Sequence, residues 1–268
     1  MSFDLSKAEA GLAATSFAGH LNHLPSTGST NTLALEAAQS GQRIGVWVAD
    51  EQTAGRGRGG HSWHSVAGDG LYVSALVTPA LPLSMALLIS LATGLAAKQA
   101  IRKAANFEID IRWPNDLMAH GKKCGGILVE TAIAPPADAA REAELRYAVI
   151  GIGINLNHES FPEEIAALAT SLRIESGHSF DRETLLVDLL CALEDELNLL
   201  TQRGADPLLA RVAAASTWIR GKRVRVEENG GYTGITAGMD PRGFLLVDGD
   251  DGVRHTVLSG GVREQREN

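Results

Sequence analysis

The chain has 268 residues, of which 44% are hydrophobic and 21% charged, and its formal net charge at pH 7 is −8. These proportions are those of a globular protein with a real core, built as one large domain or as one domain plus a small one. The acidic balance argues against a dominant nucleic-acid surface, because such domains usually carry a basic face. We therefore expect no nucleic-acid partner.

The sequence shows no sign of a membrane-spanning segment, a signal peptide or a disulfide framework. The longest apolar stretch, residues 81–100, is interrupted by proline, glycine and hydroxyl side chains, so no continuous span of about 18 apolar residues is predicted. The first 19 residues lack the basic start and apolar centre of a signal peptide. Cys124 and Cys191 are too few for a disulfide framework and form no metal motif. We expect a cytoplasmic protein with no membrane contact and no protein-bound metal.

The first half of the chain alternates between helical and strand-like segments. Residues 1–20, rich in Ala, Ser and Gly, are predicted to form a weakly ordered lead-in or a short helix, and residues 1–24 are set apart from the catalytic domain as this lead-in. A helix is predicted over 29–39, because a Ser/Thr/Asn cluster precedes it and Gly41 follows it. Short apolar runs at 44–49 and 71–77 have the length of buried strands, and Ser84 is expected to cap a long helix ending near residue 105.

The middle of the chain continues this pattern. Apolar and charged residues alternate over 107–113, which predicts a half-buried strand that ends at the turn signal Trp-Pro-Asn-Asp. Further strands are predicted over 126–131 and 145–155, joined by a loop with Pro135 and Pro136. Helices are expected over 161–172, 182–201 and 206–217.

The pattern changes after Trp218. Short β-like runs, separated by Gly and Asp clusters, follow at spacings of roughly ten residues, over 224–226, 232–237, 243–247 and 253–258. They predict a small β-barrel or sandwich, with a domain boundary near 218–221.

Residues 52–63, Gln-Thr-Ala-Gly-Arg-Gly-Arg-Gly-Gly-His-Ser-Trp, are the most informative segment. The glycines let the backbone approach a ligand closely, and Arg56 and Arg58 supply planar charged groups that suit phosphate and carboxylate oxygens. The alternative is a solvated Gly/Arg turn. The segment also matches the G-x-G-x-x-G pattern, but a poor helix start follows it, which disfavours a dinucleotide fingerprint. A kinase loop is disfavoured too, because the strand at 71–77 holds no lysine.

Other motifs are weaker when taken alone. Lys123 precedes two glycines at the entry to a strand, where a close ligand approach competes with an ordinary surface lysine pair. Asn155 ends the run Gly-Ile-Gly-Ile-Asn, whose glycines would leave space above a pocket. The polar cluster at 29–31 either caps a helix or holds a carboxylate or urea-like group. His61 and His64 are best read as loop histidines, because no acidic or Cys partner lies nearby in sequence.

Together these motifs resemble one family. In a single order the chain carries Ser29-Thr30-Asn31, then Gln52 with the Gly-Arg loop and Trp63, then Trp-Pro-Asn-Asp-Leu at 113–117, then Lys123 with Gly-Ile-Leu-Val-Glu at 126–130, then Gly-Ile-Gly-Ile-Asn at 151–155. This series resembles the biotin protein ligases over about residues 25–220. The resemblance implies an α+β fold: a mixed-sheet catalytic domain over 25–219 and a small SH3-like β-barrel over 220–268.

The resemblance also implies the chemistry. Biotin and ATP, with Mg²⁺, would give biotinyl-5′-AMP, and the biotinyl group would then pass to a lysine of a carboxyl carrier domain of acetyl-CoA carboxylase. A lipoate or octanoate ligase of the same fold and a non-catalytic biotin sensor remain alternatives. A monomer or a homodimer would fit.

The resemblance assigns roles residue by residue. Biotin contacts fall on Ser29, Thr30, Asn31, Gln52, Arg56, Gly57, Arg58, Gly125 and Gly126. Nucleotide contacts fall on Gly55, Arg58, Trp63, Asn115, Lys123 and Asn155, with Trp63 covering the adenine. Lys123 and Arg58 would act at the carboxylate–phosphate junction, and Asp116 would assist the incoming amine.

Two departures from the family pattern stand out. Many members have a basic residue where this chain has Gly59-Gly60-His61-Ser62, so loop closure is expected to be weaker or pH-sensitive. Only a short segment precedes Ser29, which predicts a ligase without the N-terminal DNA-binding domain of the bifunctional members.

Overall fold

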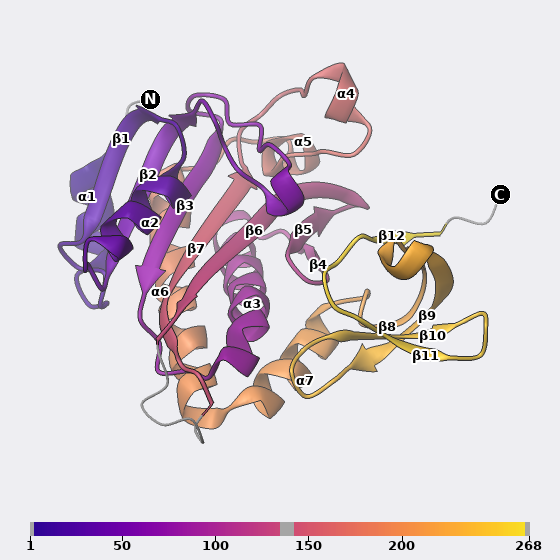
Figure 1. Ribbon diagram of the computed structural model, residues 1–268. Helices are drawn as coiled ribbons and strands as arrows, with labels where there is room; N and C mark the ends of the chain where they lie inside the picture. Colours follow the sequence, from indigo (N-terminus) through magenta and orange to yellow (C-terminus); the bar gives the residue numbers. More distant parts are fainter. Residues whose placement is uncertain (1–2, 135–141, 266–268) are drawn as a thin grey trace.

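The computed structural model describes residues 3–134 and 142–265, and a mixed seven-stranded sheet forms its centre, in the order β1-β2-β3-β7-β6-β5-β4 (Figure 1). Only β1 and β2 run parallel, and every other neighbouring pair is antiparallel. The strands are β1 (Leu21–Thr27), β2 (Gly45–Gln52), β3 (Gly70–Val77), β4 (Asp110–Arg112), β5 (Asp116–Ala119), β6 (Lys122–Ile133) and β7 (Leu145–Asn155).

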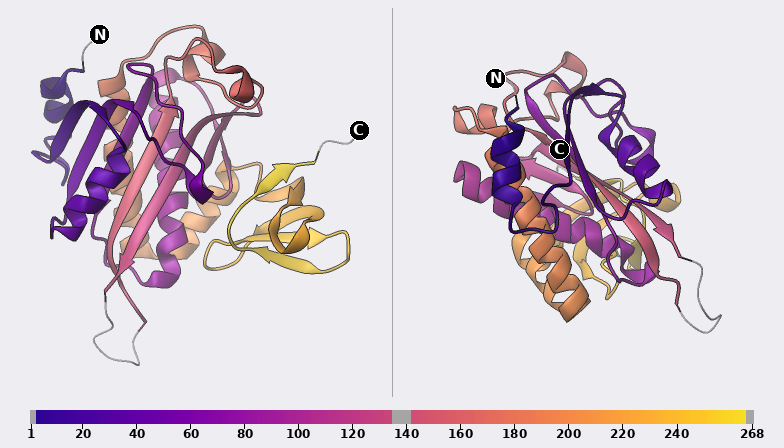
Figure 2. Two further views of the ribbon diagram at one scale, coloured as in Figure 1. Left: turned by 45° about the horizontal axis from the view of Figure 1, so that its top comes forward. Right: turned by 90° about the vertical axis from the view of Figure 1, so that its left-hand side faces the viewer.

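Helices cover the sheet unequally (Figure 2). The helix α2 (Thr30–Gln39) packs alone on one face, over Trp47, Leu76 and Val149. The opposite face carries α3 (Ala86–Ala105) and α6 (Arg182–Arg203), which pack on each other and enclose the main core. The shorter helices are α1 (Leu5–Leu12), α4 (Glu163–Ala166), α5 (Leu172–Ser176) and α7 (Ala205–Ala215). Beside α2, its face of the sheet is covered by the Gly-Arg loop with its short 3₁₀ turn Arg58–Gly60.

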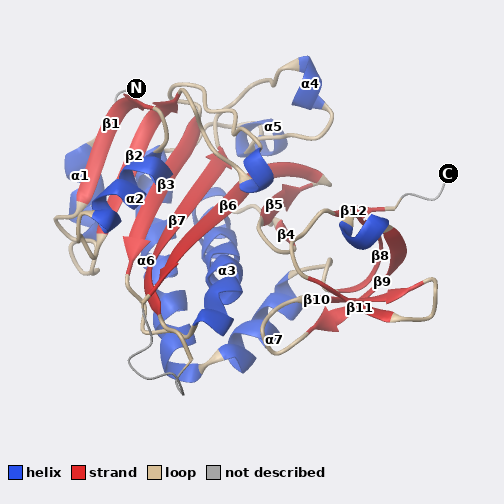
Figure 3. Cartoon of the chain, in the orientation of Figure 1, coloured by secondary structure: helices blue, strands red, loops and turns tan. Residues whose placement is uncertain are grey.

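A second, five-stranded antiparallel sheet begins at Arg220, in the order β11-β10-β9-β8-β12 (Figure 3). Its strands are β8 (Arg220–Val226), β9 (Tyr232–Met239), β10 (Leu245–Gly249), β11 (Arg254–Val257) and β12 (Val262–Glu264). The indole Nε1 of Trp113 donates to the Gly243 carbonyl at 2.8 Å, which ties the two sheets together. The α+β class with a small C-terminal β module is confirmed, whereas the division into domains at residue 220 stays a prediction.

The N-terminal segment differs from the expected weakly ordered lead-in over 1–24. Asp4 caps α1 by accepting from the Lys7 amide at 3.0 Å, and α1 packs on α6. Phe3, Leu12 and Phe17 are buried in the main core, and β1 then forms the edge of the sheet. The alanines and glycines hid this order, because a few well-spaced apolar side chains are enough to dock a short helix.

Three other segments also differ from expectation. Ser84 does not cap α3, because a 3₁₀ turn over Leu83–Met85 comes first and Met85 occupies the cap position. The strand expected over 107–113 shrinks to β4, and β5 follows its turn unpredicted. The helix expected over 161–172 is instead α4, a β-bridge from Ala169 to Lys123, and the start of α5. The expected loop with Pro135 and Pro136 lies outside the described residues.

The helix α3 is long and apolar. Within the described residues, Leu83–Ala105 is the one helical segment long and apolar enough to cross a membrane. Its most apolar window is 67% buried inside the protein, against α6 and the sheet. Packing in the main core accounts for its apolar character.

Candidate active site

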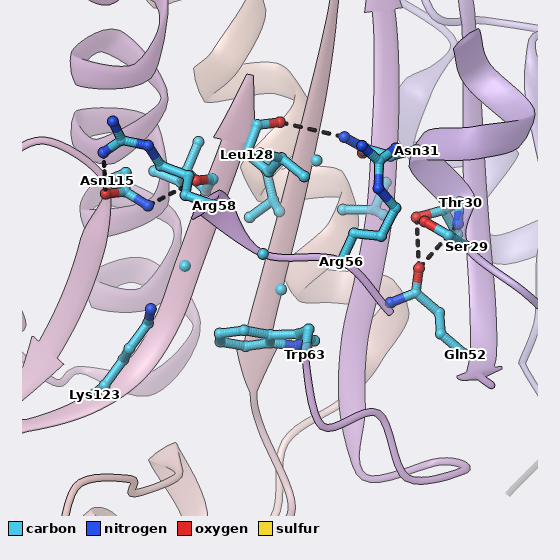
Figure 4. Close-up of a pocket in the computed structure, with 17 residues that line it drawn as sticks. Ser29, Thr30, Asn31, Gln52, Arg56, Arg58, Trp63, Asn115, Lys123 and Leu128 are labelled. Atoms are coloured by element: carbon cyan, nitrogen blue, oxygen red, sulfur yellow. Dashed lines mark hydrogen bonds between the residues drawn. The ribbon is translucent and has the colours of Figure 1, made fainter. Parts of the chain in front are cut away.

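A pocket lies beside α2 on the same face of the sheet, over the middle of β3, β7 and β6 (Figure 4). It collects side chains from the start of α2, the end of β2, the Gly-Arg loop and the β4–β5 turn. The predicted residues that line it are Ser29, Thr30, Asn31, Gln52, Arg56, Gly57, Arg58, Trp63, Asn115, Lys123 and Gly126.

Glycines form the floor of the pocket. Gly151 and Gly153 alternate along β7 and so face the same side, and Gly126 pairs with Gly153 across the ladder. A Cβ at Gly151 would overlap the Asn31 amide, and one at Gly153 would meet the indole of Trp63 at 2.5 Å. The glycines of the Gly-Ile-Gly-Ile-Asn motif therefore give room for pocket side chains to lie directly on the sheet.

Gly125 does not share this role, contrary to expectation. It is the strand neighbour of Gly126, so it faces the opposite side of the sheet. A Cβ there would meet Leu117 at 2.8 Å and the Gly153 carbonyl at 2.9 Å. Its missing side chain serves sheet packing and gives no space to a ligand.

A register shift brings Lys123 to the pocket. In the β5–β6 ladder Leu117 pairs with Gly125 and Met118 with Lys123, so Cys124 is left over as in a β-bulge. Without this extra residue Lys123 and Gly126 would face opposite sides, because their separation is odd. The bulge places the Lys123 side chain beside Gly126. Burial of the bulged Cys124 raises the pKa of its thiol to about 12, so it stays a neutral core residue.

One end of the pocket is a network of neutral hydrogen-bonding groups. Gln52 Oε1 accepts from the amide and the hydroxyl of Thr30, at 2.9 and 3.1 Å. The Ser74 hydroxyl bridges Thr30 Oγ1 at 2.8 Å and Asn31 Oδ1 at 2.5 Å. Ser29 occupies the N-cap position of α2 and is buried, yet its side chain makes no capping hydrogen bond. These groups suit a neutral polar ligand with both donors and acceptors.

Arg56 lies at this same end, and its charge is compensated. Its guanidinium donates to both carboxylate oxygens of Glu130, at 2.8 and 3.2 Å. Asn31 Nδ2 also donates to Glu130, at 3.0 Å. The carboxylate therefore fixes both side chains and cancels the net charge at this end of the pocket.

The other end holds Lys123 and Arg58. Lys123 Nζ lies 2.5 Å from Asp116 Oδ1, and Arg112 Nη2 lies 2.5 Å from Asp116 Oδ2. Burial alone would raise the pKa of Asp116, but Lys123 and Arg112 outweigh it and hold this pKa below its usual value of 3.8. Asp116 lies behind Lys123 and outside the pocket lining.

Arg58 differs from the other pocket cations in its partners. Its guanidinium donates to Asn115 Oδ1 at 3.0 Å and to the Ser259 carbonyl at 2.6 Å. Within ranges 3–134 and 142–265, no carboxylate forms an ion pair with it. Burial lowers its pKa from 12.5, although an arginine stays protonated near neutral pH. Its positive charge is therefore left for a bound anion.

Trp63 lies between Lys123 and Gln52 in the pocket (Figure 4) and also lines a second hollow. Lys123 Nζ lies 5.3 Å from the centroid of the Trp63 ring. The indole Nε1 of Trp63 is buried and has no hydrogen-bond partner among the described residues. The second hollow adds Asn155, Phe161 and Ile165, and Asn155 Nδ2 donates to the Thr170 carbonyl at 3.0 Å. Asn155 thus lines the second hollow, which shares Trp63 and Lys123 with the pocket.

The loop itself needs its glycines for geometric reasons. Gly55 accepts from the Trp63 amide at 2.9 Å, and a Cβ on Gly55 would meet the Trp63 carbonyl at 2.7 Å. Gly59 and Gly60 both have positive φ, at 63° and 80°, in the turn after Arg58. A side chain at either position would be strained, so the unusual Gly-Gly pair has a local backbone explanation.

Several residues of the site escaped sequence reasoning. Glu130 stood inside a recognised motif without a role, and Ser74 is a lone hydroxyl in an apolar strand, a signal that a buried polar contact is needed. Ser259 and Glu228 gave no sequence signal, since their partners in space are distant in the chain. Arg112 went unnoticed although its partner Asp116 lies only four residues further along. No group of three or more His, Cys, Asp or Glu side chains in the described parts is arranged to hold a metal.

Comparisons with known proteins agree with this architecture. The model of the biotin/lipoate A/B protein ligase family matches residues 24–155, and that of the biotin protein ligase C-terminal domain matches residues 220–262. The chain is 35% identical over 239 residues to the bifunctional ligase/repressor BirA of Bacillus spizizenii, with 88% of this chain and 71% of that protein covered. It therefore belongs to the biotin/lipoate protein ligase family.

Further similarities narrow the position within that family. Over 249 residues the chain is 35% identical to the biotin–[acetyl-CoA-carboxylase] ligase of Mycobacterium tuberculosis, covering 90% of this chain and 87% of the relative. The biotin protein ligase from Aquifex aeolicus in complex with biotin and ATP has a TM-score of 0.76 at 27% identity, over 93% of this chain and 100% of that one. Together with the C-terminal match, these place the chain among the biotin protein ligases.

Proposed function

We propose that this protein activates biotin with ATP to biotinyl-5′-AMP and transfers the biotinyl group to a lysine of a biotin carboxyl carrier domain, that of acetyl-CoA carboxylase. The names of its relatives and the biotin- and ATP-bound Aquifex structure support this activity. The single observation that carries it is the pocket itself, which has a neutral hydrogen-bonding end and a cationic end.

The chemistry explains why the two ends differ. A carboxylate does not react with an amine, because oxide is a poor leaving group, so it must first become a mixed anhydride. A carboxylate oxygen of biotin attacks the α-phosphorus of ATP, and the bond to pyrophosphate breaks. Two anions must approach each other for this, so cations at the junction lower the barrier. Mg²⁺ enters with ATP and carries the charge of the β- and γ-phosphates.

We assign the uncharged ureido group of biotin to the end formed by Ser29, Thr30, Asn31 and Gln52. That end offers hydrogen bonds without net charge, because Glu130 compensates Arg56. The carboxylate would then reach Arg58 and Lys123 at the opposite end. The nucleotide would lie on the far side of Trp63, where the second hollow presents Asn155.

The contacts of Asp116 favour a role other than the expected help to the incoming amine. Both of its carboxylate oxygens are engaged, by Lys123 and by Arg112, and its pKa is lowered. A weakly basic carboxylate with no free oxygen is a poor acceptor for the proton of an incoming amine. We propose instead that Asp116 orients Lys123 at the junction.

Two alternatives share parts of this site. A lipoate or octanoate ligase would need no neutral hydrogen-bonding end, since those acids have apolar tails. A biotin sensor would need no cation left uncompensated at the opposite end, whereas Arg58 is held there by neutral acceptors. Both observations favour the biotin ligase.

The test is biotin-dependent exchange of pyrophosphate into ATP by the purified protein, with octanoate and lipoate in parallel. Exchange with biotin alone is expected, and Lys123→Ala is expected to abolish it. Lys122→Ala is the matched control, because its neighbouring side chain is exposed and outside the pocket. Equal exchange with octanoate would favour the lipoate-type ligase, and no exchange with any acid would favour the sensor.

Several points stay predictions: a cytoplasmic location, a monomer or homodimer, the lack of a nucleic-acid or membrane partner, the lack of a protein-bound metal and of an N-terminal DNA-binding domain, and pH-sensitive loop closure. For the last, the exposed His61 contributes its carbonyl to the Gly57 amide at 2.7 Å, so the turn itself does not depend on its ring. Dissociation of biotinyl-AMP that is flat between pH 6 and 8 would remove the pH hypothesis.

A further inference from the structure

The C-terminal module contacts the pocket residue Arg58 through the carbonyl of Ser259, which lies in the connection between β11 and β12. This oxygen accepts from Arg58 at 2.6 Å and is one of the two acceptors that hold the guanidinium. Gly260, next along the chain, lies so close that a Cβ on it would meet Arg58 Nη1 at 3.2 Å. Arg58 is therefore packed against the segment 258–260, which joins β11 to β12.

This segment is held from behind by a single carboxylate. Glu228, in the 3₁₀ turn Glu228–Gly230 after β8, accepts from the Leu258 amide at 3.0 Å. It also accepts from the Ser259 amide and, at 2.7 Å, from the Ser259 hydroxyl. Since the amides of this turn point toward Glu228, the Ser259 carbonyl is left to point toward Arg58.

The hydrogen bonds show that Glu228 acts as an anion here. Burial opposes its ionisation, but the Leu258, Ser259 and Gly260 groups that donate to it outweigh burial and keep its pKa below its usual value. Glu228 forms no ion pair with Arg58, although its negative charge is near enough to favour the protonated guanidinium. It orders the carbonyl that accepts from the arginine without contacting the guanidinium itself.

We propose that Glu228 is a positioning residue for the adenylation step: it clamps the turn at 258–260 so that the Ser259 carbonyl holds Arg58 at the carboxylate–phosphate junction. The inference deepens the proposed function and rests on it. It gives the C-terminal sheet a defined task, which is to complete the arrangement of one cation that belongs to the other sheet.

Two pairs of variants test the clamp. Glu228→Ala removes the acceptor behind the turn. Asp248→Ala is its control, because Asp248 in β10 forms an exposed ion pair with Arg254 in the neighbouring strand β11. Gly260→Ala pushes on Arg58 from the turn. Gly252→Ala is its control, since Gly252 also has positive φ, 79° against 99°, but faces open space.

In pyrophosphate exchange, Glu228→Ala and Gly260→Ala are each expected to lower kcat about tenfold while KM for biotin stays within about twofold, because only the cation at the reacting end moves. Both controls should stay within about twofold of the unaltered protein. In a protein that already carries Arg58→Ala, adding Glu228→Ala should lower kcat by less than about twofold, because the arginine that Glu228 positions is gone.

The outcomes separate this inference from the proposed function. A Glu228→Ala loss of the same size in both backgrounds would mean general damage to the fold and would overturn the clamp, as would activity equal to that of Asp248→Ala. If Arg58→Ala impairs exchange while Glu228→Ala does not, the clamp fails and the function stands. Absence of biotin-dependent exchange in the unaltered protein would remove both.

Discussion

The two ends of the pocket carry the same kind of side chain in opposite electrostatic settings. Arg56 donates both guanidinium arms to Glu130, so its charge is compensated before any ligand arrives. Arg58, two residues further along the same loop, donates to a side-chain amide and to a backbone carbonyl. A carboxylate partner makes an arginine a fixed structural donor, whereas neutral acceptors position it and leave its charge for the ligand.

Because of this difference, substitutions near Arg58 and substitutions near Arg56 should change different kinetic constants. Changes at the Arg58 end should lower kcat of adenylation, because charge develops there in the transition state. Changes at the Arg56 end should mainly weaken biotin binding.

The largest expected effect comes from removing the uncompensated charge. Arg58→Ala should lower kcat of biotin-dependent pyrophosphate exchange by about 10²–10³-fold, the usual loss when one preorganised donor to the reacting group is removed. Biotin affinity measured by calorimetry should change by less than about threefold. Arg58→Lys should recover part of the rate, because it restores charge without the fork geometry. If Arg58→Ala lowered the biotin affinity and left kcat unchanged, the placement of Arg58 at the reacting end of the pocket would be wrong.

The next largest effect should come from the floor beneath the neutral end. Gly151→Ala would place a methyl group inside the Asn31 amide, so Asn31 must move away from Ser74 and Glu130. We expect biotin to bind about 10–100-fold more weakly, because several directed hydrogen bonds are lost together.

Gly28→Ala is the matched control for this prediction. Gly28 immediately precedes the polar cluster of α2 but has open space around it. Its biotin affinity should match that of the unaltered protein. Equal loss in both variants would mean that the floor glycines are not what shapes the biotin end.

A smaller effect is expected from neutralising Glu130. Glu130→Gln keeps the shape but releases the charge of Arg56 and exchanges an acceptor for a donor near Asn31. KM for biotin should rise about tenfold while kcat changes little, because both partners act at the binding end. A drop in kcat with unchanged KM would contradict the division of the pocket into two ends.

The smallest effect concerns stability at the Arg58 end. Asp116→Asn leaves Lys123 and Arg112 without their shared counter-charge, which should lower the free energy of unfolding by about 1–3 kcal/mol at pH 7. Because the pKa of Asp116 is lowered on folding, its stabilisation is complete above its usual value of 3.8 and disappears as the pH falls through the lower folded value.

Urea unfolding of both proteins from pH 7 to pH 3 checks this sign. The difference between them should be constant at higher pH and should shrink only in the acid range. A difference that grows on acidification would mean that the carboxylate is not stabilised as an anion in the folded protein.

Much of the site could be predicted because its residues cluster in short motifs. The Gly-Arg loop and the polar start of α2 each bring several pocket residues together within a few positions, and the structure does place them in one pocket. The strand pattern was less informative. Residues 1–24 and 161–172 were misjudged because their order depends on docking against distant elements, and local composition does not report docking.

The sequence by itself determined the chemistry available: glycines where backbone and side chains approach closely, neutral polar groups at a helix start, and three cations near them. Only the tertiary structure decided how those groups are used. The bulge at Cys124 turned Lys123 toward the pocket while strand alternation turned Gly125 away from it. Partners far along the chain, Glu130 for Arg56 and Ser259 for Arg58, decided which charge is compensated. The physical reason is that strand register sets the direction of a side chain and that long-range pairing sets the charge balance. A short segment of sequence determines neither the register nor the pairing.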